Sequence, residues 1–410
     1  MSQDTLSYLK SRGFFQQCTD EETLRKMFAE KKVHLYAGFD PTNNSLHLGH
    51  LIPIMAMAHL QKRGHFPIAL IGGGTALIGD PTGKVESRKI LTLEQIQNNS
   101  AALKLQLEKF VVLDGKDGLL VNNYDWLKEI NYLTFLRDIG RHFSVNRMLS
   151  FETYKERMKH GLSFLEFNYL LLQSYDFLEL YKRYNCTLQV GGDDQWANMV
   201  SGAELIRRVE KSEGVECLTF PLILTSDGKK MGKTESGATF LSPELTSPYD
   251  FYQYWINVTD DDVIRFLKLY TFLDLEDIKQ YEGLQYQELN VAKKRLAFEV
   301  TRIVHGEEEA VKAREGASAA FGGGDTIEFM PTTEIARKRI ETGINIVDLV
   351  VECELAASKS EVRRLIAQGG CKINSEKVVD DKLVINLDYL TDKGIIVALG
   401  KKKIRRVNVQ

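Results

Sequence analysis

The segment from Val33 to Gln61 constrains the fold of this chain more than any other. Its first part, Val33 to Phe39, is rich in β-branched and aromatic residues and predicts a strand, which the turn Asp40-Pro-Thr42 ends. Apolar residues then recur at helical spacing from about Leu46 to Gln61. A strand that leads through a tight turn into a helix N-terminus favours anion binding, because the first helical N–H groups have no partners.

Two histidines lie in the first turn of this predicted helix. His47 and His50 are three positions apart and therefore share one face. Gly49, between them, lets a ligand approach the backbone closely. Taken alone, the pattern fits a ligand-binding turn and two incidental histidines equally well.

Length and composition exclude several classes of protein. A chain of 410 residues with 43% apolar and 27% charged residues is typical of a globular protein of two or three domains. No apolar run is long enough for a signal peptide or a membrane span, so we expect no membrane partner. The five cysteines are scattered and form no C-x-x-C pair, which favours a reducing, cytoplasmic location and no protein-held metal.

Charge is unevenly distributed along the chain. Residues 331–410 contain 15 Lys and Arg against 11 Asp and Glu, a net charge of +4, whereas the whole chain has a net charge of −3. Five of these cations lie in the last ten residues. A basic module on an acidic body indicates an anionic polymer as partner, although a solubilising tail would have the same composition.

A glycine-rich segment, Gly72 to Lys84, follows a second predicted strand, Phe66 to Ile71. It is not a Walker A loop, because Lys84 is followed by Val85 and the required glycine spacing is absent. We expect these glycines to bring the backbone close to a small ligand, near the acid Asp80.

Residues 163–183 predict a buried helix that is apolar nearly all round. Tyr169, Gln173 and Asp176 lie along one stripe of it, and a buried carboxylate needs a partner from the protein or from a ligand. A strand, 187–190, then leads into Gly191-Gly-Asp-Asp-Gln195 and another helix, an arrangement that suits ribose hydroxyls at the edge of a parallel sheet.

The second half of the chain begins with a predicted strand, 220–224, and a polar loop that contains Lys230, Lys233 and Thr234. The lysines suit phosphate oxygens, but a solvated turn has the same composition. Helices are predicted from Ser247-Pro248 to His305, followed by a linker at 322–324. The tail combines a capping box, Ser358 to Glu361, with short strands.

Together these motifs resemble those of the class I aminoacyl-tRNA synthetases. His47-Leu-Gly-His50 and Lys230-Met-Gly-Lys-Thr234 resemble the two signatures of the class. The other motifs, which lie between Tyr36 and Trp196, are similar to those of bacterial tyrosyl-tRNA synthetases. The similarity runs from about residue 30 to the C-terminus.

This resemblance implies an α/β fold in which a Rossmann-like parallel-sheet catalytic domain precedes an α-helical domain and a small α+β RNA-binding C-terminal module. The implied division is a catalytic domain at 1–225, a lysine loop and connection at 226–246, a helical anticodon-region-binding domain at 247–325 and a basic RNA-binding module at 331–410. The implied activity is the joining of L-tyrosine to tRNA(Tyr). ATP, accompanied by Mg²⁺, would be a substrate, and the resemblance implies no tightly bound cofactor. A homodimer is also implied.

The resemblance further implies residue roles. Catalysis would involve Thr42, His47, His50, Lys84, Arg88, Lys230, Lys233 and Thr234. Tyrosine would be bound by Tyr36, Asp80, Tyr169, Gln173, Asp176 and Gln195. ATP would be bound by Gly38, Asp40, Gly49, Gly192, Asp194 and Lys233, and no metal is assigned to protein ligands.

Three positions depart from the family pattern. Asp193 stands where the family often has serine, Ala37 where it often has cysteine, and Pro53 lies within the first helix. The extra acid is expected to alter the field beside Asp194, and the proline to tighten or kink the helix. The alternatives are a tryptophanyl-tRNA synthetase, which shares both signatures, and an RNA-binding relative that no longer aminoacylates.

Overall fold

The computed structural model describes residues 3–81, 91–222, 233–234, 237–322, 332–374, 376–391, 394–400 and 403–410. Chain contacts divide it into two compact units. The first contains residues 1–234, 238–245 and 259–286, and the second contains 235–237, 246–258 and 287–410. The division into four domains that the sequence implies stays a prediction. No helix within the described part is long and apolar enough to cross a bilayer.

The first unit is built on a mixed sheet of six strands in the order β1-β6-β5-β2-β3-β4. The short edge strand β1 (Gln17–Cys18) is antiparallel to its neighbour. The other described strands of this sheet run parallel: β2 (His34–Phe39), β3 (Phe66–Ile71), β4 (Leu119–Asn122), β5 (Cys186–Gly192) and β6 (Glu216–Phe220). The predicted Rossmann-like class is confirmed. Strand β6 ends at Phe220, so the described part of the predicted strand at 220–224 shares only Phe220 with it, and residues 223–224 lie outside the described residues. Strand β4 was not predicted.

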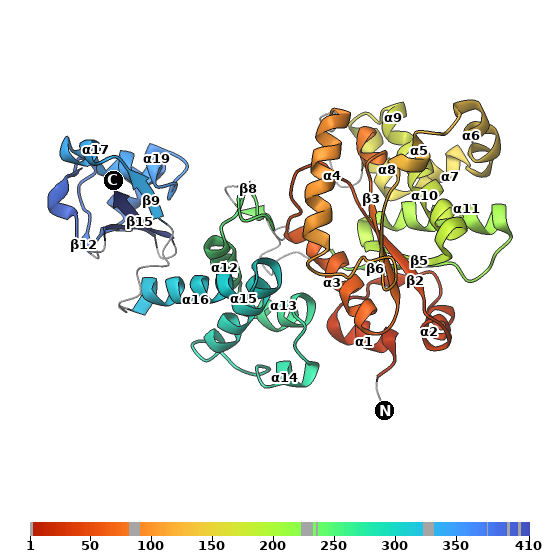
Figure 1. The fold of residues 1–410 in the computed structure, drawn as a ribbon, viewed down its shortest axis with the longest axis horizontal. Helices are drawn as coiled ribbons and strands as arrows, with labels where there is room; N and C mark the ends of the chain where they lie inside the picture. Colours follow the sequence, from red (N-terminus) through yellow and green to blue (C-terminus); the bar gives the residue numbers. More distant parts are fainter. Residues whose placement is uncertain are drawn as a thin grey trace. The chain divides into compact units, whose positions relative to one another are not determined.

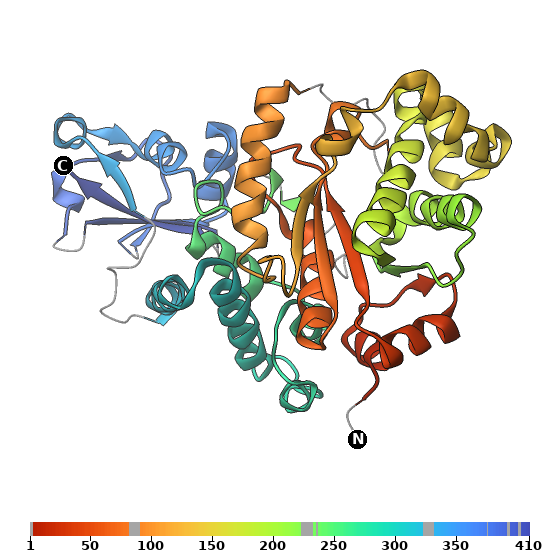
Figure 2. The same ribbon diagram turned by 45° about the vertical axis from the view of Figure 1, so that its right-hand side comes forward.

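Helices cover both faces of this sheet (Figures 1 and 2). One face packs against α3 (Leu48–Lys62) and α4 (Leu93–Leu107), and the other against α10 (Tyr169–Tyr184) and α11 (Trp196–Glu210). Because both faces are buried, β3 is apolar throughout and fully buried. The predicted helix at 163–183 is in fact two, α9 (Phe164–Phe167) and α10, separated at Asn168.

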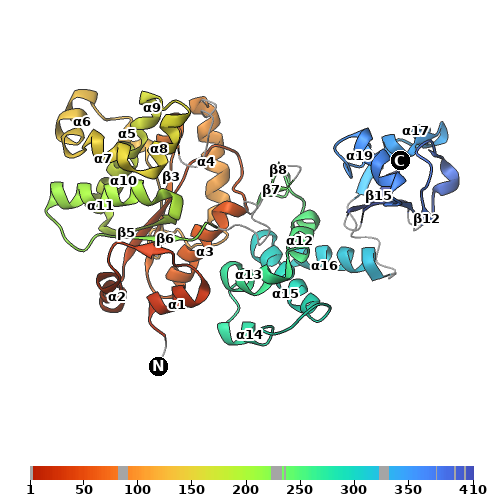
Figure 3. The same cartoon turned by 180° about the vertical axis from the view of Figure 1, so that it is seen from behind.

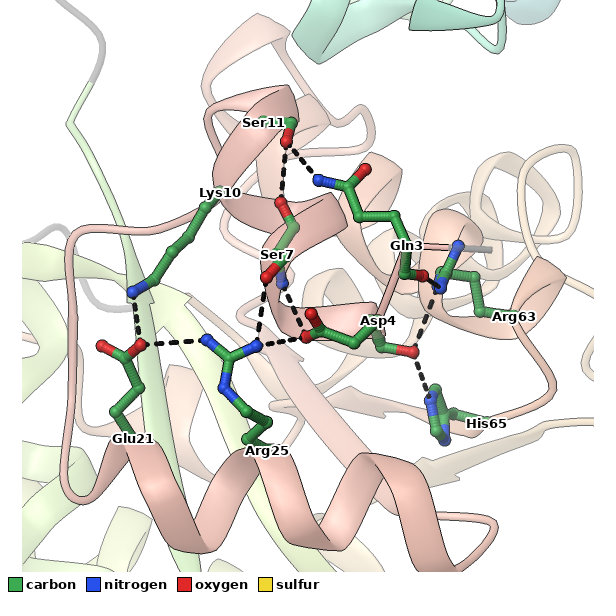
Figure 4. A network of polar contacts seen from close by, with 10 residues as sticks. Gln3, Asp4, Ser7, Lys10, Ser11, Glu21, Arg25, Arg63 and His65 are labelled. Carbon is green, nitrogen blue, oxygen red and sulfur yellow. Dashed lines mark hydrogen bonds and ion pairs between the residues drawn. The ribbon is translucent and has the colours of Figure 1, made fainter. Parts of the chain in front are cut away.

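Short helices complete the first unit. They comprise α1 (Thr5–Arg12), α2 (Glu21–Glu30), α5 (Tyr124–Leu127), α6 (Tyr132–Asp138), α7 (Val145–Ser150), α8 (Glu152–Lys159), α13 (Val263–Tyr270) and α14 (Leu275–Lys279). Figure 4 shows how Arg25 of α2 joins α1, with its Nη1 2.6 Å from Asp4 Oδ1. This pair is about half exposed and therefore contributes little, about 0–1 kcal/mol. Buried apolar side chains such as Leu6, Leu9 and Leu24 do more to hold these helices.

The second unit begins with three helices, α12 (Pro248–Ile256), α15 (Leu289–His305) and α16 (Glu307–Gly322). Ser247 caps α12 and Pro248 takes its first position, as predicted. The helical region continues beyond the predicted end at His305, because α16 begins immediately after Gly306 and extends to Gly322.

A small α+β module follows. Its sheet has the order β12-β11-β14-β15-β9, formed by β9 (Thr332–Ile335), β11 (Cys371–Ile373), β12 (Glu376–Lys377), β14 (Ile395–Leu399) and β15 (Lys403–Val409). The helices α17 (Arg337–Glu341), α18 (Ile346–Glu352) and α19 (Lys359–Ala367) accompany it (Figure 3). The strands alternate buried and less buried residues over a separate apolar core. Ser358 caps α19, but Glu361 accepts from Ala357 N–H, so the capping box is only half formed.

Candidate active site

A cavity of about 500 Å³ opens at the carboxyl ends of the parallel strands of the first unit. Ligands bind at this edge in open α/β sheets. Every predicted site residue whose side chain the structure describes lines this cavity: Tyr36, Gly38, Asp40, Thr42, His47, Gly49, His50, Asp80, Tyr169, Gln173, Asp176, Gly192, Asp194 and Gln195. The structure thus brings together residues from distant parts of the chain.

The predicted cationic residues lie largely outside the described part. Lys84, Arg88 and Lys230 fall in ranges that the structure does not describe. Lys233 and Thr234 are described only in their backbone, which forms the short strand β7 (Lys233–Thr234). Their predicted roles stay predictions.

Tyr36 and Asp176 form the innermost polar part of the cavity. Each is only 1% exposed, and they come from β2 and α10. The Tyr36 hydroxyl has no hydrogen-bond partner among the residues that the structure describes. Burial, reinforced by the nearby Asp176 carboxyl group, raises the pKa of Tyr36 well above its usual value. This tyrosine therefore presents a neutral hydroxyl to the cavity.

Asp176 is held by two donors that the sequence did not reveal. Its Oδ2 accepts from Asn123 Nδ2 at 2.9 Å and its Oδ1 accepts from Trp126 Nε1 at 2.8 Å. Burial raises the pKa of Asp176 to about 8, although both hydrogen bonds act to lower it. Of the alternatives left open by the sequence, the partners within the protein are therefore present; because the carboxyl group also lines the cavity, a contact with a ligand stays a prediction.

Asn123 connects this pair to the rest of the site. It is fully buried just after β4, and its Nδ2 also donates to Thr75 Oγ1 at 3.0 Å. Its own Oδ1 accepts the Gly74 N–H at 2.7 Å. Recognising β4 as a strand of the sheet would have pointed to Asn123, because polar residues at the carboxyl end of a parallel strand face the ligand edge.

Gln189 is a second residue that the sequence motifs missed. It lies on β5, is 3% exposed and lines the cavity. Its Oε1 is buried and, within the described part of the chain, has no hydrogen-bond partner, like the Tyr36 hydroxyl. Buried polar atoms are nearly always hydrogen-bonded, so two orphaned atoms facing one cavity indicate a polar ligand.

The remaining polar groups of the cavity are linked to one another. Tyr169 donates its hydroxyl proton to Asp40 Oδ2 at 3.0 Å, and Asp40 Oδ1 accepts from Thr75 at 2.8 Å. Asp80 accepts from Gln195 Nε2 at 2.9 Å. A cluster of two carboxylates with phenol and amide groups around one space suits a cation such as an ammonium group.

A further amide links two of the predicted tyrosine-binding residues. Asn198 Nδ2 lies 3.0 Å from Gln173 Oε1 and 3.1 Å from Gln195 Oε1 and donates to both. Both glutamines line the cavity. Because Asn198 binds both amide oxygens, the amide nitrogens act as donors elsewhere, as Gln195 Nε2 does to Asp80.

The two histidines cap α3 reciprocally. The Gly49 N–H donates to His47 Nδ1 at 3.1 Å, and the His47 N–H donates to His50 Nδ1 at 3.1 Å. Their ring centroids lie only 3.9 Å apart. A Cβ on residue 49 would meet the His47 ring at 2.8 Å, which explains the glycine. The helix continues unbroken through Pro53, which lines the same cavity.

Two neighbouring positions also have partners within the protein. Gly72 lines the cavity, and a Cβ there would lie 1.9 Å from Asp40 Oδ1, while Gly73 is similarly limited by Asn122; the expected approach of a ligand to this backbone stays a prediction. Asp193 is absent from the cavity lining, and its Oδ1 accepts from Gln17 and from Thr219, each at 2.7 Å. This acid therefore ties β6 to the N-terminal segment, and its expected effect on the field beside Asp194 stays a prediction.

Comparison with known proteins agrees with this geometry. The family model for class I tRNA synthetases (W and Y) matches residues 29–322, and the model for a tyrosine–tRNA ligase C-terminal domain matches 325–407. Tyrosine–tRNA ligase of Acetivibrio thermocellus is 52% identical over 98% of both chains, and that of Clostridium kluyveri is 50% identical over 98% of both.

Solved structures give the same result. The C-terminally truncated mitochondrial tyrosyl-tRNA synthetase of Aspergillus nidulans is similar with a TM-score of 0.71 and 30% identity. The match covers 78% of this chain and 95% of that one. The chain therefore belongs to the tyrosine–tRNA ligases, a family of class I tRNA synthetases.

Proposed function

We propose that the cavity binds L-tyrosine and ATP and joins the amino acid to tRNA(Tyr) in two steps. In the first, a tyrosine carboxylate oxygen attacks the α-phosphorus of ATP, and the bond to pyrophosphate breaks. In the second, a hydroxyl at the 3′ end of the tRNA attacks the carbonyl carbon of tyrosyl-adenylate, and AMP leaves. The observation that carries this proposal is the unpartnered Tyr36 hydroxyl beside the buried Asp176.

The phenol ring of the substrate tyrosine lies in the part of the cavity that Tyr36 and Asp176 line. Its hydroxyl group meets Tyr36 and Asp176, while Asn123 and Trp126 fix the orientation of the Asp176 carboxyl group. Asp80, Tyr169, Gln173 and Gln195 surround the ammonium group, in keeping with their links around one space. Phenylalanine would leave buried polar groups unpaired, which disfavours its binding.

The nucleotide lies nearer the N-terminus of α3. Thr42, His47 and His50 contact its phosphates, and Gly38, Asp40, Gly49, Gly192 and Asp194 line the space for the remainder. A Cβ on Gly38 would meet no protein atom within 4 Å, so the room beside it is available to a ligand. Lys84, Arg88, Lys230, Lys233 and Thr234 supply positive charge and hydrogen bonds to the departing pyrophosphate.

Mg²⁺ enters with ATP as part of the substrate, held mainly by phosphate oxygens and water. Among the described residues, no group of three or more His, Cys, Asp and Glu side chains is arranged to hold a metal ion. The chain's own contribution is to position the two substrates and to stabilise developing charge.

Amino-acid-dependent exchange of pyrophosphate into ATP tests this function. Exchange with tyrosine alone supports the proposal, and exchange with tryptophan in its place would favour the tryptophan enzyme of the same class. A chain that binds tRNA but catalyses no exchange with any amino acid would be a non-aminoacylating relative. Transfer to tRNA(Tyr) is then measured with labelled tyrosine.

A second copy of the chain is the partner we assign to the apolar surface of residues 132–165. Leu133 on α6 is 75% exposed, and Phe164 on α9 is 71% exposed. Other exposed apolar side chains of this segment are Tyr132 on α6, Val145 on α7 and Met158 on α8. Exposed apolar side chains concentrated in one segment are typical of an interface. Leu133→Asp with Phe164→Asp should convert a dimer to a monomer in sedimentation; an unchanged mass would exclude this surface.

The tRNA is the partner we assign to residues 331–410. The net charge of +4 on this module suits the phosphate backbone. We place the enzyme in the cytoplasm, in line with its free cysteine thiols, four of which are buried.

A further inference from the structure

Gln106, in the last turn of α4, makes contacts that no motif reveals. Its side chain is nearly fully buried. Its Oε1 accepts the Leu46 N–H at 2.9 Å and lies 3.3 Å from Ser45 Oγ, and its Nε2 donates to the Asn44 carbonyl at 3.5 Å. These three residues lead directly into His47, which caps α3. The amide therefore holds the backbone immediately before the double-histidine turn.

The same face of α4 also holds the beginning of this connection. Asn99, seven positions before Gln106, donates its Nδ2 proton to the Pro41 carbonyl at 3.0 Å. Residues at i and i+7 share one face of a helix. Two amides of one helix thus hold both ends of the connection between β2 and α3, and this connection carries Thr42.

Residues Thr239–Ser242 pair with the same stretch of backbone. The Leu48 N–H donates to the Thr239 carbonyl at 3.1 Å, and the Leu241 N–H donates to the Leu46 carbonyl at 2.8 Å. His47 and Phe240 form an antiparallel bridge between these two hydrogen bonds.

Ser45 continues this ladder. The Ser242 N–H donates to Ser45 Oγ at 3.1 Å, so one hydroxyl lies between Ser242 and the Gln106 amide. In sequence, this ladder comes shortly after Lys233-Thr234. The end of the lysine-bearing segment is thus joined to the N-terminal end of α3.

We propose that Gln106 is a positioning residue for adenylate formation, acting through Ser45 and Leu46 without touching either substrate. It keeps the backbone before His47 in the position that the strand-like pairing with Thr239–Ser242 requires. It thereby fixes where residues Thr239–Ser242 meet the double-histidine turn. This inference rests on the proposed function. The Leu46 N–H is buried and needs an acceptor, and an apolar side chain at position 106 would pack but would not provide one.

Gln106→Leu tests the proposal, with Gln97→Leu as the matched control because Gln97 is exposed on the same helix. In tyrosine-dependent pyrophosphate exchange, Gln106→Leu should lower kcat by about tenfold to a hundredfold, the effect of misplacing a reacting group by about 1 Å. The KM for tyrosine should change by less than about twofold, because Tyr36 and Asp176 belong to other elements. The control should leave both constants unchanged.

Ser45→Ala provides a second variant if Gln106→Leu folds poorly, which thermal denaturation would reveal. It removes the hydroxyl between the amide and Ser242 and should lower kcat in the same manner. In the double variant, kcat should fall by less than the product of the two single effects, because both substitutions act through the contact between Gln106 and Ser45.

Three results would overturn the inference: a kcat equal to that of the Gln97 control, an equal loss of tyrosine affinity, or independent effects of the two substitutions. Failure of the proposed function is distinguishable, since the unmodified chain would then show no tyrosine-dependent exchange at all.

Discussion

Replacing Tyr36 by phenylalanine should affect folding and substrate use in opposite directions. The hydroxyl is buried and, without ligand, has no hydrogen-bond partner in the described ranges of the chain. The ring would keep its packing against Phe177, whose centroid lies 5.2 Å away. The substitution therefore removes one polar atom without disturbing the apolar core around it.

The magnitudes follow from the missing hydrogen bond. Leaving a hydroxyl buried without a partner costs about 1–3 kcal/mol, so the ligand-free Tyr36→Phe variant should be at least as stable as the parent. A hydrogen bond to the substrate hydroxyl contributes about 0.5–1.5 kcal/mol, and its loss should lower kcat/KM for tyrosine by roughly twofold to tenfold. Phenylalanine makes no such bond in either protein, so the ratio of kcat/KM for tyrosine to kcat/KM for phenylalanine should fall. Tyrosyl-tRNA synthetase is itself the established example of rejecting phenylalanine in this way.

The assay combines thermal denaturation without ligand and pyrophosphate exchange with each amino acid. Tyr8→Phe is the matched control, because the Tyr8 hydroxyl lies 2.9 Å from His59 Nδ1 and accepts from Arg12 Nε at 2.9 Å. This variant loses a hydrogen-bonded hydroxyl that does not line the cavity. Its stability should therefore fall, while its discrimination between tyrosine and phenylalanine stays unchanged.

Two outcomes would refute this reasoning. One is a Tyr36→Phe protein destabilised as much as Tyr8→Phe, which would mean that the hydroxyl has a partner in the ligand-free state. The other is unchanged discrimination against phenylalanine, which would mean that the hydroxyl does not meet the substrate.

Three further predictions concern Asp176 and the C-terminal module. Asp176→Asn should weaken tyrosine use and narrow the gap to phenylalanine in exchange assays; unchanged discrimination would rule out its role. Burial raises the pKa of Asp176 to about 8, so the folded state favours the protonated form of its carboxyl group. The resulting contribution to the free energy of unfolding is fully present below pH 4 and should be lost as pH rises through 8. Chemical denaturation of the ligand-free protein between pH 4 and 9 should show this fall, and Asp176→Asn should flatten it; parallel curves would contradict the raised pKa. Removing residues 331–410 should leave exchange intact and impair tRNA charging, whereas equal loss of both would contradict a separate tRNA-binding module.

The stretch from β2 to α3 was the part of the fold best predicted from sequence. Its residue types change from strand-forming to helix-forming across a proline-containing turn, and these preferences act locally. Strand β2 accordingly begins only one residue later than predicted, at His34, but α3 begins at Leu48, so His47 caps the helix and does not lie in its first turn. Strand β4 was missed because it is only four residues long, although the turn signals Asp114-Gly115 and Asp117-Gly118 precede it.

The environment of Asp176 shows why part of the site was hidden. The helical stripe with Tyr169 and Gln173 was visible because three residues at helical spacing lie on one element. The donors Asn123 and Trp126 lie about fifty positions away, and nothing local marks them as partners. Hydrogen bonds between distant segments depend on strand order, which spacing along the chain does not encode.

The sequence by itself determined the motifs, their order, the family they belong to and the residue types that must meet the substrates. Only the tertiary structure decided that Gly72 makes room for Asp40, that Asp193 bonds to Gln17 and Thr219, and that Gln106 supports the turn before His47. The reason is physical: side-chain chemistry and local periodicity are properties of the chain, whereas the satisfaction of a buried polar group depends on which distant atom packs within about 3 Å of it.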